Sequence, residues 1–469
     1  MLSSKTHALR FIALAAIAVA IGPIYFYEVQ LINVLKVTDN ALVPPSEARP
    51  KNTSPPRLVL HVGLPKTATS AIQCRLNDME RRDVLSQKMS AKIVEIESCR
   101  TEPFMHRVQM SKYFEQFPLE LNALKNQSDT ETSNKYTTYD RVIKGSSVLQ
   151  HCLDVWINHY DRISIPDCWG KSYQRYINTY HQAGSSIFVI SNENLALPPF
   201  GKVPDPTACG IIFDNMLESL GQNSEIDIIL TQRLHFDRMI SMFGQEYDGD
   251  KFYSRPKLKR WTSDGGSTVP YLEKYINNFP VDQLAQAIKC FQYATKNPRI
   301  SFQVIDFHSK QPGVVMAFME KLTRNATLTR QLADENHIVG TENVAVERDN
   351  RMQFDRIAIA AKKAGIVPDS KERYEVRNDV SKYFEDNGLK IATDAKLKCP
   401  PAKFYDRLVN DTILIHQLAF PDEPVHTVRN RLRMFDFQPF RDIFCEVDGD
   451  ATVQDEVMRS FPDQYKTLT

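Results

Sequence analysis

A charge excess, metal-binding cysteine motifs and long polar stretches are all missing from this 469-residue sequence. Its 58 Lys and Arg residues nearly balance its 57 Asp and Glu residues, so the formal net charge is +1. A generally basic, nucleic-acid-binding surface is therefore not expected, and an anionic partner must be met by a local patch. Apolar and aromatic residues are spread along the chain, which disfavours long disordered regions. No Cys-x-x-Cys or Cys/His cluster has metal-ligand spacing, so we expect no metal site.

One apolar run predicts a membrane segment. FIALAAIAVAIGPIYFY, residues 11–27, contains no charged residue, and residues 1–10 before it are basic. A bilayer needs about 20 apolar residues, so this run can span one if flanking side chains reach toward the headgroups. The positive charge predicts that residues 1–10 form a cytoplasmic tail.

A cleaved signal peptide is the alternative, because Ala18-Val19-Ala20 resembles a small-residue cleavage site. We favour an uncleaved signal anchor, since the apolar run continues beyond Ala20. Residues 28–56 then contain VPPSEARPKNTSPP, which is typical of an extended stem or linker. Either interpretation places the rest of the chain in the secretory lumen.

Cysteines and glycosylation tripeptides agree with a luminal location. An even number of cysteines follows the anchor, and several are expected to pair in an oxidising lumen, although their spacing does not give the pairs. The eight are Cys74, Cys99, Cys152, Cys168, Cys209, Cys290, Cys399 and Cys445. Glycosylation tripeptides begin at Asn52, Asn126, Asn325 and Asn410.

Residues 57–342 have the pattern of an α/β domain. Continuous apolar, β-rich runs predict strands that are covered on both faces. These runs are RLVLHV (57–62), SIFVIS (186–191), IDIILT (226–231) and ISFQVIDF (300–307). Helical patterns lie at Thr69–Arg81, Thr207–Leu220, Phe236–Tyr247, Val281–Ala294 and Gly313–Leu322. This alternation predicts a central parallel sheet flanked by helices.

Two segments depart from the alternation. Residues 83–185 are long, irregular and rich in aromatic and polar residues, which indicates helices and loops inserted into the sheet topology. Residues 343–469 are highly charged and mostly helical in pattern. They predict a helical C-terminal subdomain or cover.

The stretch LVLHVGLPKTATSAIQ, residues 58–73, places one cation among small hydroxylated residues between a strand and a helix. A helix N-terminus presents unpaired N–H groups and a partial positive charge, and so favours an anion. Lys66 adds a full charge there. The pattern is not a Walker A loop, which ends in Gly-Lys-Ser/Thr after four intervening residues. An ordinary ATPase or kinase is therefore disfavoured.

GLPKTATSAIQ instead resembles the 5′-phosphosulfate-binding loop of sulfotransferases, which commonly runs Pro-Lys-[Ser/Thr]-Gly-Thr-[Thr/Ser]. The residues that match in order are Pro65, Lys66, Thr67, Thr69 and Ser70. Ala68 stands where that family usually has Gly. If the position needs a positive φ, Ala68 is strained there by roughly 1 kcal/mol or more.

A second motif strengthens the resemblance. The family binds its donor's 3′-phosphate with an Arg at a strand end and a Ser eight residues later on the next helix. Arg233 and Ser241 have that spacing after the strand IDIILT. A guanidinium gives a bidentate phosphate contact, and the hydroxyl adds a donor. Asp237 is positioned to cap the same helix.

The resemblance covers about residues 57–325 and implies a P-loop-like sheet that uses 3′-phosphoadenosine 5′-phosphosulfate (PAPS) as co-substrate, without a metal. The Lys-Gly-x-x-Gly-Asp-Trp loop of soluble cytosolic members is missing. With its anchor, stem and glycosylation tripeptides, the chain is most similar to Golgi carbohydrate sulfotransferases and their bacterial relatives. That similarity implies a type II Golgi membrane protein whose luminal domain acts on a carbohydrate acceptor.

Sulfuryl transfer resembles phosphoryl transfer, so positioning and charge stabilisation carry most of the catalysis. Lys66 is expected to stabilise the leaving group. Glu193 follows the strand SIFVIS at the sheet edge where ligands bind, and is our candidate general base. A Glu that only begins a loop or caps a helix explains the position equally well. His151 and His159 are weaker alternatives, and His61, inside the first strand, favours a structural role.

The acceptor is poorly specified by the sequence. RPKLKRW, residues 255–261, suits an anionic glycan that stacks on Trp261, although a solvated charged loop is the plainer interpretation. Trp156, Tyr160 and Trp169 of the inserted segment are further candidates for a sugar cleft. The alternative function is a catalytically impaired nucleotide- or glycan-binding protein that keeps the sulfotransferase fold. Ala68 and the two equal interpretations of the candidate base Glu193 favour it.

Overall fold

A computed structural model describes the chain in segments. These are residues 54–64, 67–96, 149, 153, 171–193, 195–197, 199–203, 205–248, 281–308, 312–338, 354, 357–359, 361–362, 365–368, 370–388, 397–398, 401–433 and 446–447. The predicted anchor at 11–27, the stem and most of the inserted segment lie outside them. No helix within these segments has the length and apolar character needed to cross a bilayer.

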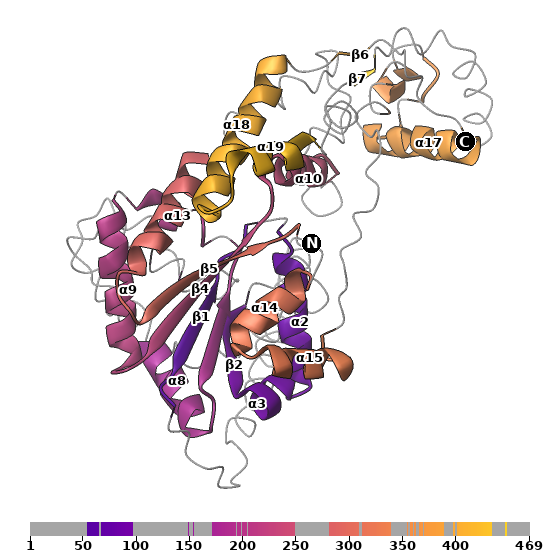
Figure 1. The fold of residues 1–469 in the computed structure, drawn as a ribbon. Coiled ribbons are helices and arrows are strands. Elements are labelled where there is room, and N and C mark those ends of the chain that lie inside the picture. The colour runs from indigo at the N-terminus through magenta and orange to yellow at the C-terminus, as the bar shows by residue number, and fades with distance from the viewer. Residues whose placement is uncertain are drawn as a thin grey trace, which may run out of the picture. The chain divides into compact units, whose positions relative to one another are not determined.

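The centre of the fold is a five-stranded, all-parallel sheet with the order β2-β3-β1-β4-β5 (Figure 1). Its strands are β1 (Arg57–His61), β2 (Ala91–Ile96), β3 (Ile187–Ser191), β4 (Glu225–Gln232) and β5 (Ile300–Asp306). β1 and β3 are buried along their whole length, as their continuous apolar sequences predict. The four predicted strands are confirmed, and the α/β class with them.

The sequence prediction missed the edge strand β2, which lies inside the segment predicted to be irregular. Its sequence AKIVEI places Lys92 and Glu95 at half-buried positions between buried ones. An edge strand is covered less completely than a central one, so its apolar run is interrupted by charge. That interruption hid the strand.

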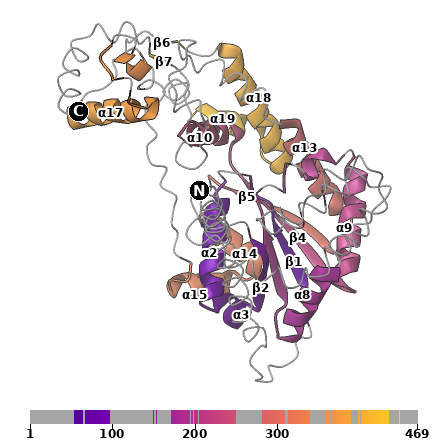
Figure 2. The ribbon, with the colours of Figure 1, turned by 180° about the vertical axis from the view of Figure 1, so that it is seen from behind.

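Helices cover both faces of the sheet, and the two layers remain on opposite sides when the molecule is turned (Figure 2). One layer contains α2 (Thr69–Arg81), α3 (Val84–Met89), α14 (Val314–Thr323) and α15 (Ala326–Asp334). The other contains α8 (Lys171–Gln182), α9 (Pro206–Leu220) and α13 (Val281–Ala294). The five predicted helices match α2, α9, α10 (His235–Asp248), α13 and α14 to within one residue at each end.

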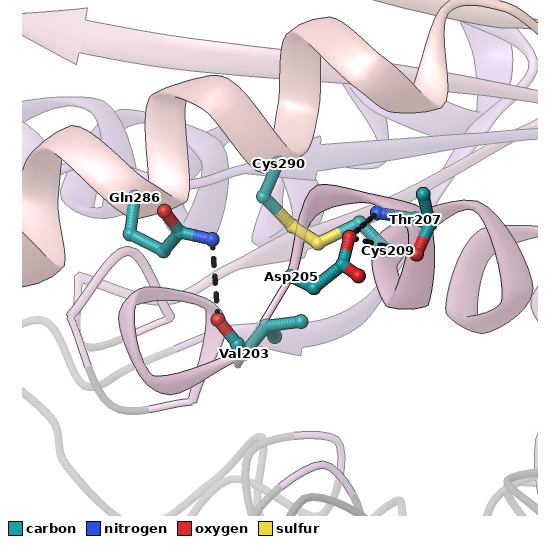
Figure 3. Close-up of a disulfide and its surroundings, with 6 residues drawn as sticks. All are labelled: Val203, Asp205, Thr207, Cys209, Gln286 and Cys290. Atoms are coloured by element: carbon teal, nitrogen blue, oxygen red, sulfur yellow. Dashed lines mark hydrogen bonds between the residues drawn. A yellow bond between two sulfur atoms is a disulfide. The ribbon is translucent and has the colours of Figure 1, made fainter.

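A disulfide between Cys209 and Cys290 joins α9 to α13 across a sequence separation of 81 residues (Figure 3). Beside it, Asp205 caps α9 by accepting a hydrogen bond of 2.6 Å from the backbone N–H of Thr207. Closing a chain loop of this length removes conformational freedom from the unfolded state, which stabilises the fold by about 4 kcal/mol. The structure thus identifies the Cys209–Cys290 pair, which the spacing of the cysteines does not predict.

The amino ends of the strands are held by a buried carboxylate. Asp227 of β4 is fully buried and accepts hydrogen bonds from Arg57, Arg324 and Ser301. Burial alone would raise the pKa of Asp227, but the hydrogen bonds from Arg324 and Ser301 and the charge of Arg57 lower it below its ordinary value. Asp227 therefore fastens β1, β5 and the end of α14 to the middle of the sheet.

The helices in the described C-terminal residues include α17 (Arg373–Asp386), α18 (Ala402–Ala419) and α19 (Val425–Arg433). Ile415 and Ala419 of α18 belong to the same buried core as α9 and α13. A separate small core surrounds α17, and β6 (Leu397–Lys398) pairs antiparallel with β7 (Glu446–Val447). The helical pattern predicted after residue 343 is present, while its separation as a subdomain stays a prediction.

Candidate functional site

The loop that follows β1 lies at the carboxyl edge of the sheet, between the ends of β3 and β4. After β1 the chain enters the helix layer of α2, whereas after β3 and β4 it continues to α9 and α13 in the opposite layer. In open parallel sheets, a ligand crevice forms where neighbouring connections leave in opposite directions. The topology therefore puts the loop at residues 62–69 where a ligand site is expected.

The loop is closed by its own hydrogen bonds. The Thr67 hydroxyl donates to the Leu64 carbonyl at 2.6 Å and accepts from the Leu64 N–H at 3.1 Å. The backbone N–H of Thr67 also donates to the Leu64 carbonyl. A Cβ atom on Gly63 would lie 1.9 Å from Cγ2 of Thr69, so this tight turn requires glycine at residue 63.

Ala68 adopts the left-handed conformation, with φ 65° and ψ 12°, as the N-cap residue of α2. A non-glycine residue carries a steric penalty there, so the strain expected from the sequence applies. Among the described residues no side chain caps this helix N-terminus, and its first turn contains no acidic residue. The helix start is thus suited to an external anion.

The three hydroxyls of the loop are placed differently. Thr67 is fully buried and its hydroxyl proton is used inside the loop. The Thr69 hydroxyl donates to Oε2 of Glu193 at 2.9 Å. Ser70 is exposed in the first turn of α2. Of the three, Ser70 is the one whose hydroxyl faces solvent, while Thr67 and Thr69 shape the site.

Glu193 is half-buried two residues after β3, at the same edge of the sheet as the loop. Gln73 of α2 donates to the Ser191 carbonyl at 3.3 Å, and the Asn192 N–H donates to the His61 carbonyl. These bonds fix the end of β3 against β1 and α2. The structure therefore brings together Thr69 of the anion loop and Glu193, the candidate base. The sequence analysis assigned these two residues to separate motifs.

His61 ties the central strands beneath the loop. Its Nδ1 lies 2.7 Å from Oγ of Ser191 on β3, and its Nε2 lies 2.8 Å from Oγ1 of Thr231 on β4. Complete burial lowers the pKa of His61 to about 3. A neutral imidazole that bridges two hydroxyls is a structural element, as the position of His61 inside a strand suggested.

Arg233 follows β4 and lies in an ion pair with Asp237, one helical turn further along the chain. Its guanidinium also stacks over the ring of Phe307, 4.7 Å from the ring centroid. Asp237 is therefore part of a side-chain ion pair. The N–H of Phe236 in the first turn of α10 is bound instead by the Thr412 hydroxyl of α18, at 2.8 Å.

Several predicted residues lie outside the described segments. Pro65 and Lys66 are among them, so the structure gives no geometry for the predicted catalytic cation. His151, His159, Trp156, Tyr160, Trp169 and residues 255–261 are in the same situation. Ser241 is described and is half-buried on α10, about one helical turn after Asp237.

Sequence reasoning missed two neighbours of Arg233. Phe307 and His308 directly follow β5, whose last residue, Asp306, pairs in register with Gln232 of β4. Ligands bind at the carboxyl ends of the strands in open parallel sheets. Applied to the predicted strand at 300–307, this rule points to both residues. Arg431, which contacts Asp306 at 2.8 Å, had no sequence signal because it lies 125 residues away.

No protein-family model, curated protein or solved structure matches this chain. Within the described residues, no group of three or more His, Cys, Asp and Glu side chains has the arrangement of a metal site.

Proposed function

We propose that this chain is a luminal, membrane-anchored sulfotransferase that moves a sulfuryl group from PAPS to a hydroxyl of a carbohydrate. The observation that carries the proposal is the turn after β1. Its left-handed Ala68, its closely packed Gly63 and the uncapped start of α2 form a cradle for an anion. The order of strands and the Lys66 motif support a P-loop-like sheet, and the same cradle would hold the 5′-phosphosulfate.

PAPS supplies the activated sulfuryl group and a bisphosphate leaving group. In the proposed mechanism, the N–H groups at the start of α2 and the Ser70 hydroxyl bind its anionic oxygens. Lys66 neutralises the charge that develops on the leaving oxygen. Glu193 accepts the proton of the acceptor hydroxyl while that oxygen attacks sulfur and the bond from sulfur to the leaving oxygen breaks.

The hydrogen bond from Thr69 supports this role for Glu193. It binds one carboxylate oxygen, Oε2, at 2.9 Å and so restricts the orientation of the carboxylate. In the proposed mechanism the other carboxylate oxygen, Oε1, accepts the proton of the acceptor hydroxyl. A general base needs this kind of fixed geometry before its pKa matters.

Arg233 and Ser241 are proposed to bind the 3′-phosphate of the donor. The guanidinium carbon of Arg233 lies 4.7 Å from the centroid of the Phe307 ring, and the N–H groups of a guanidinium can bind a phosphate through a bidentate contact. The phosphate would take the place that the Asp237 carboxylate has on Arg233. Binding is then an exchange of one anion for another.

Disulfide bonding supports the luminal location. The three described cysteines, Cys74, Cys209 and Cys290, are all disulfide-bonded. Structural disulfides persist in oxidising compartments and are rare in the cytosol. The basic N-terminus and the apolar run at 11–27 support a type II anchor in the Golgi membrane.

A catalytically impaired nucleotide- or glycan-binding protein is the second candidate. The existing ion pair of Arg233 with Asp237 favours it, because the donor's phosphate must displace the Asp237 carboxylate. Ala68 also favours it, because the resembled family usually has glycine at this left-handed position. The two candidates differ in transfer: the sulfotransferase moves sulfate to an acceptor, whereas the second candidate binds a nucleotide or a glycan without transferring sulfate.

The test uses the purified full-length chain in detergent with PAPS carrying labelled sulfate and a panel of neutral and anionic glycans. Binding of adenosine 3′,5′-bisphosphate is measured by calorimetry on the same preparation. Binding with transfer to one class of glycan is expected. Binding of the bisphosphate without transfer to any acceptor supports the nucleotide-binding form of the second candidate. Neither binding nor transfer contradicts the proposed sulfotransferase.

A further inference from the structure

A cluster of charged side chains lies where β4 and β5 end. Arg233 and Asp237 form one ion pair, and Asp306 and Arg431 form another, with N–O distances up to 2.8 Å. His308 lies between the two pairs, with its Nε2 3.7 Å from Oδ2 of Asp237. The cluster is half-buried, so its charges interact more strongly than they would in open water.

A backbone contact favours the neutral form of His308. The N–H of Leu234 donates to Nε2 of His308 at 3.3 Å. A nitrogen that accepts a hydrogen bond carries no proton, so the ring in this arrangement is neutral and protonated at Nδ1. The backbone N–H of His308 meanwhile donates to Oδ1 of Asp306 at 2.9 Å, which fixes the position of the residue.

One oxygen of Asp237 faces both Arg233 and His308. In the arrangement observed, its Oδ2 lies against Nε of Arg233. If Nε2 of His308 took up a proton, that nitrogen would become a donor 3.7 Å from the same oxygen, and would lose the Leu234 contact. A short movement of the carboxylate would then exchange Arg233 for His308.

We propose that His308 is a positioning residue of the donor site, and that it takes over Asp237 when an anion binds to Arg233, with uptake of one proton from solvent. This rests on the proposed function, because it takes Arg233 as the 3′-phosphate ligand. The ligand class is a nucleoside bisphosphate. The Asp237 carboxylate remains paired in both states, so the exchange avoids leaving a half-buried charge without a partner.

The charges around His308 agree with such coupling. Burial lowers the pKa of His308, Asp237 and Asp306 raise it, and Arg233 and Arg431 lower it further. An anion on Arg233 would cancel one lowering charge and turn Asp237 toward the ring. Both changes raise the pKa of His308, so binding and protonation favour each other.

The C-terminal helices stabilise this arrangement. Arg431 of α19 contacts Asp306 at 2.8 Å and Glu423 at 3.1 Å, and Glu423 in turn lies 2.6 Å from the buried ring of His416. With these two carboxylates around it, Arg431 stays in place when the charge on His308 changes. Arg431 thereby attaches α19 to the carboxyl end of β5, beside Arg233 and His308.

The test is calorimetry of adenosine 3′,5′-bisphosphate with the full chain at pH 5.5, 6.5 and 7.5, in buffers of different ionisation heat. The ligand's own phosphates titrate near pH 6, so wild type is compared with His308→Gln. Relative to that variant, wild-type affinity is expected to rise about 3- to 10-fold from pH 7.5 to 5.5, with uptake of a proton. Asp237→Asn is expected to bind more tightly at pH 7.5 and to lose the difference.

His337→Gln is the matched control. The side chain of His337 is 21% exposed, as is that of His308, and its Nε2 also faces a carboxylate, Glu335, at 3.3 Å. It lies after α15, away from the strand ends, and should keep the wild-type pH profile. Equal pH profiles for wild type and His308→Gln overturn this inference alone. No binding at any pH overturns the proposed function as well.

Discussion

The Thr69 hydroxyl donates a hydrogen bond of 2.9 Å to Glu193, across 124 residues of sequence. Thr69 begins α2 directly after the left-handed Ala68, and Glu193 follows β3. The contact joins the two motifs that the sequence proposed separately, the anion loop and the candidate base. A substitution in either motif can therefore affect the other.

Glu193→Gln should lower kcat by about 10²- to 10⁴-fold, the usual contribution of a general base, because the amide cannot accept the acceptor's proton. Donor affinity should change little, since the proposed donor contacts come from other residues. Gln keeps a carbonyl oxygen for the Thr69 hydrogen bond, so the melting temperature should hold. The measurement is kcat, donor Kd and melting temperature on one preparation. A lower melting temperature with nearly unchanged kcat would mean that Glu193 is structural.

Ala68→Gly should stabilise the fold by about 1 kcal/mol, because glycine adopts φ 65° without a clash against Cβ. Activity should be equal or higher. The matched control is Ala71→Gly, inside the first turn of α2, which should destabilise by about 1 kcal/mol. Urea denaturation of both variants gives the sign of each change in the free energy of unfolding. If Ala68→Gly is the less stable protein, the left-handed turn is not under strain.

Arg233→Ala should raise the apparent KM for PAPS about 10- to 150-fold, because a charge-assisted phosphate contact contributes about 1.5–3 kcal/mol. The variant should also discriminate poorly between PAPS and an analogue without the 3′-phosphate. Arg330→Ala, at an exposed position on α15, serves as the control and should behave as wild type. A wild-type enzyme that already ignores the 3′-phosphate would remove Arg233 and Ser241 from the site.

Asp227→Asn should destabilise the fold by about 3–5 kcal/mol at neutral pH, because it leaves the cations of Arg57 and Arg324 without their buried carboxylate. The pKa of Asp227 is below its ordinary value, so its contribution is present above the unfolded-state pKa of about 3.9. It is lost as the pH falls through the lower folded-state pKa. Chemical denaturation between pH 3 and 7 should therefore show a flatter profile for Asp227→Asn than for wild type.

Asp214→Asn is the matched control for that measurement. Asp214 is exposed on α9 and accepts a hydrogen bond of 2.8 Å from Asn297. An exposed carboxylate contributes little, so this variant should stay close to wild type at every pH. Equal destabilisation of the two variants would contradict the role given to Asp227.

The sheet was predictable because its central strands are covered on both faces. The sequence of β3 is IFVIS, and in β4 the buried Asp227 is followed by the apolar run IIL, so the apolar signal dominates in both strands. The edge strand β2 was not predictable in the same way, since Lys92 and Glu95 interrupt it. The positive φ on which the expected strain at Ala68 depends is present in the structure, at 65°.

Contacts between distant segments could not be predicted. Asp237 looked like a helix cap, yet it pairs with Arg233, while Thr412 of α18 binds the first turn of α10 instead. The sequence allows Cys209 to pair with any other cysteine. The packing of α9 against α13 brings it to Cys290. In each case the partner is chosen by packing in three dimensions, which local sequence patterns do not carry.

The central claim is that the loop from Gly63 to Ser70 binds the phosphosulfate, and the direct measurement is PAPS binding to wild type and Lys66→Ala by calorimetry. Lys289→Ala, at an exposed position on α13, controls for the loss of one lysine charge. We expect Lys66→Ala to weaken PAPS binding by at least about 10-fold, the loss of one charge-assisted contact, while Lys289→Ala binds as wild type. Equal PAPS affinity for wild type and Lys66→Ala would contradict the assignment of this loop.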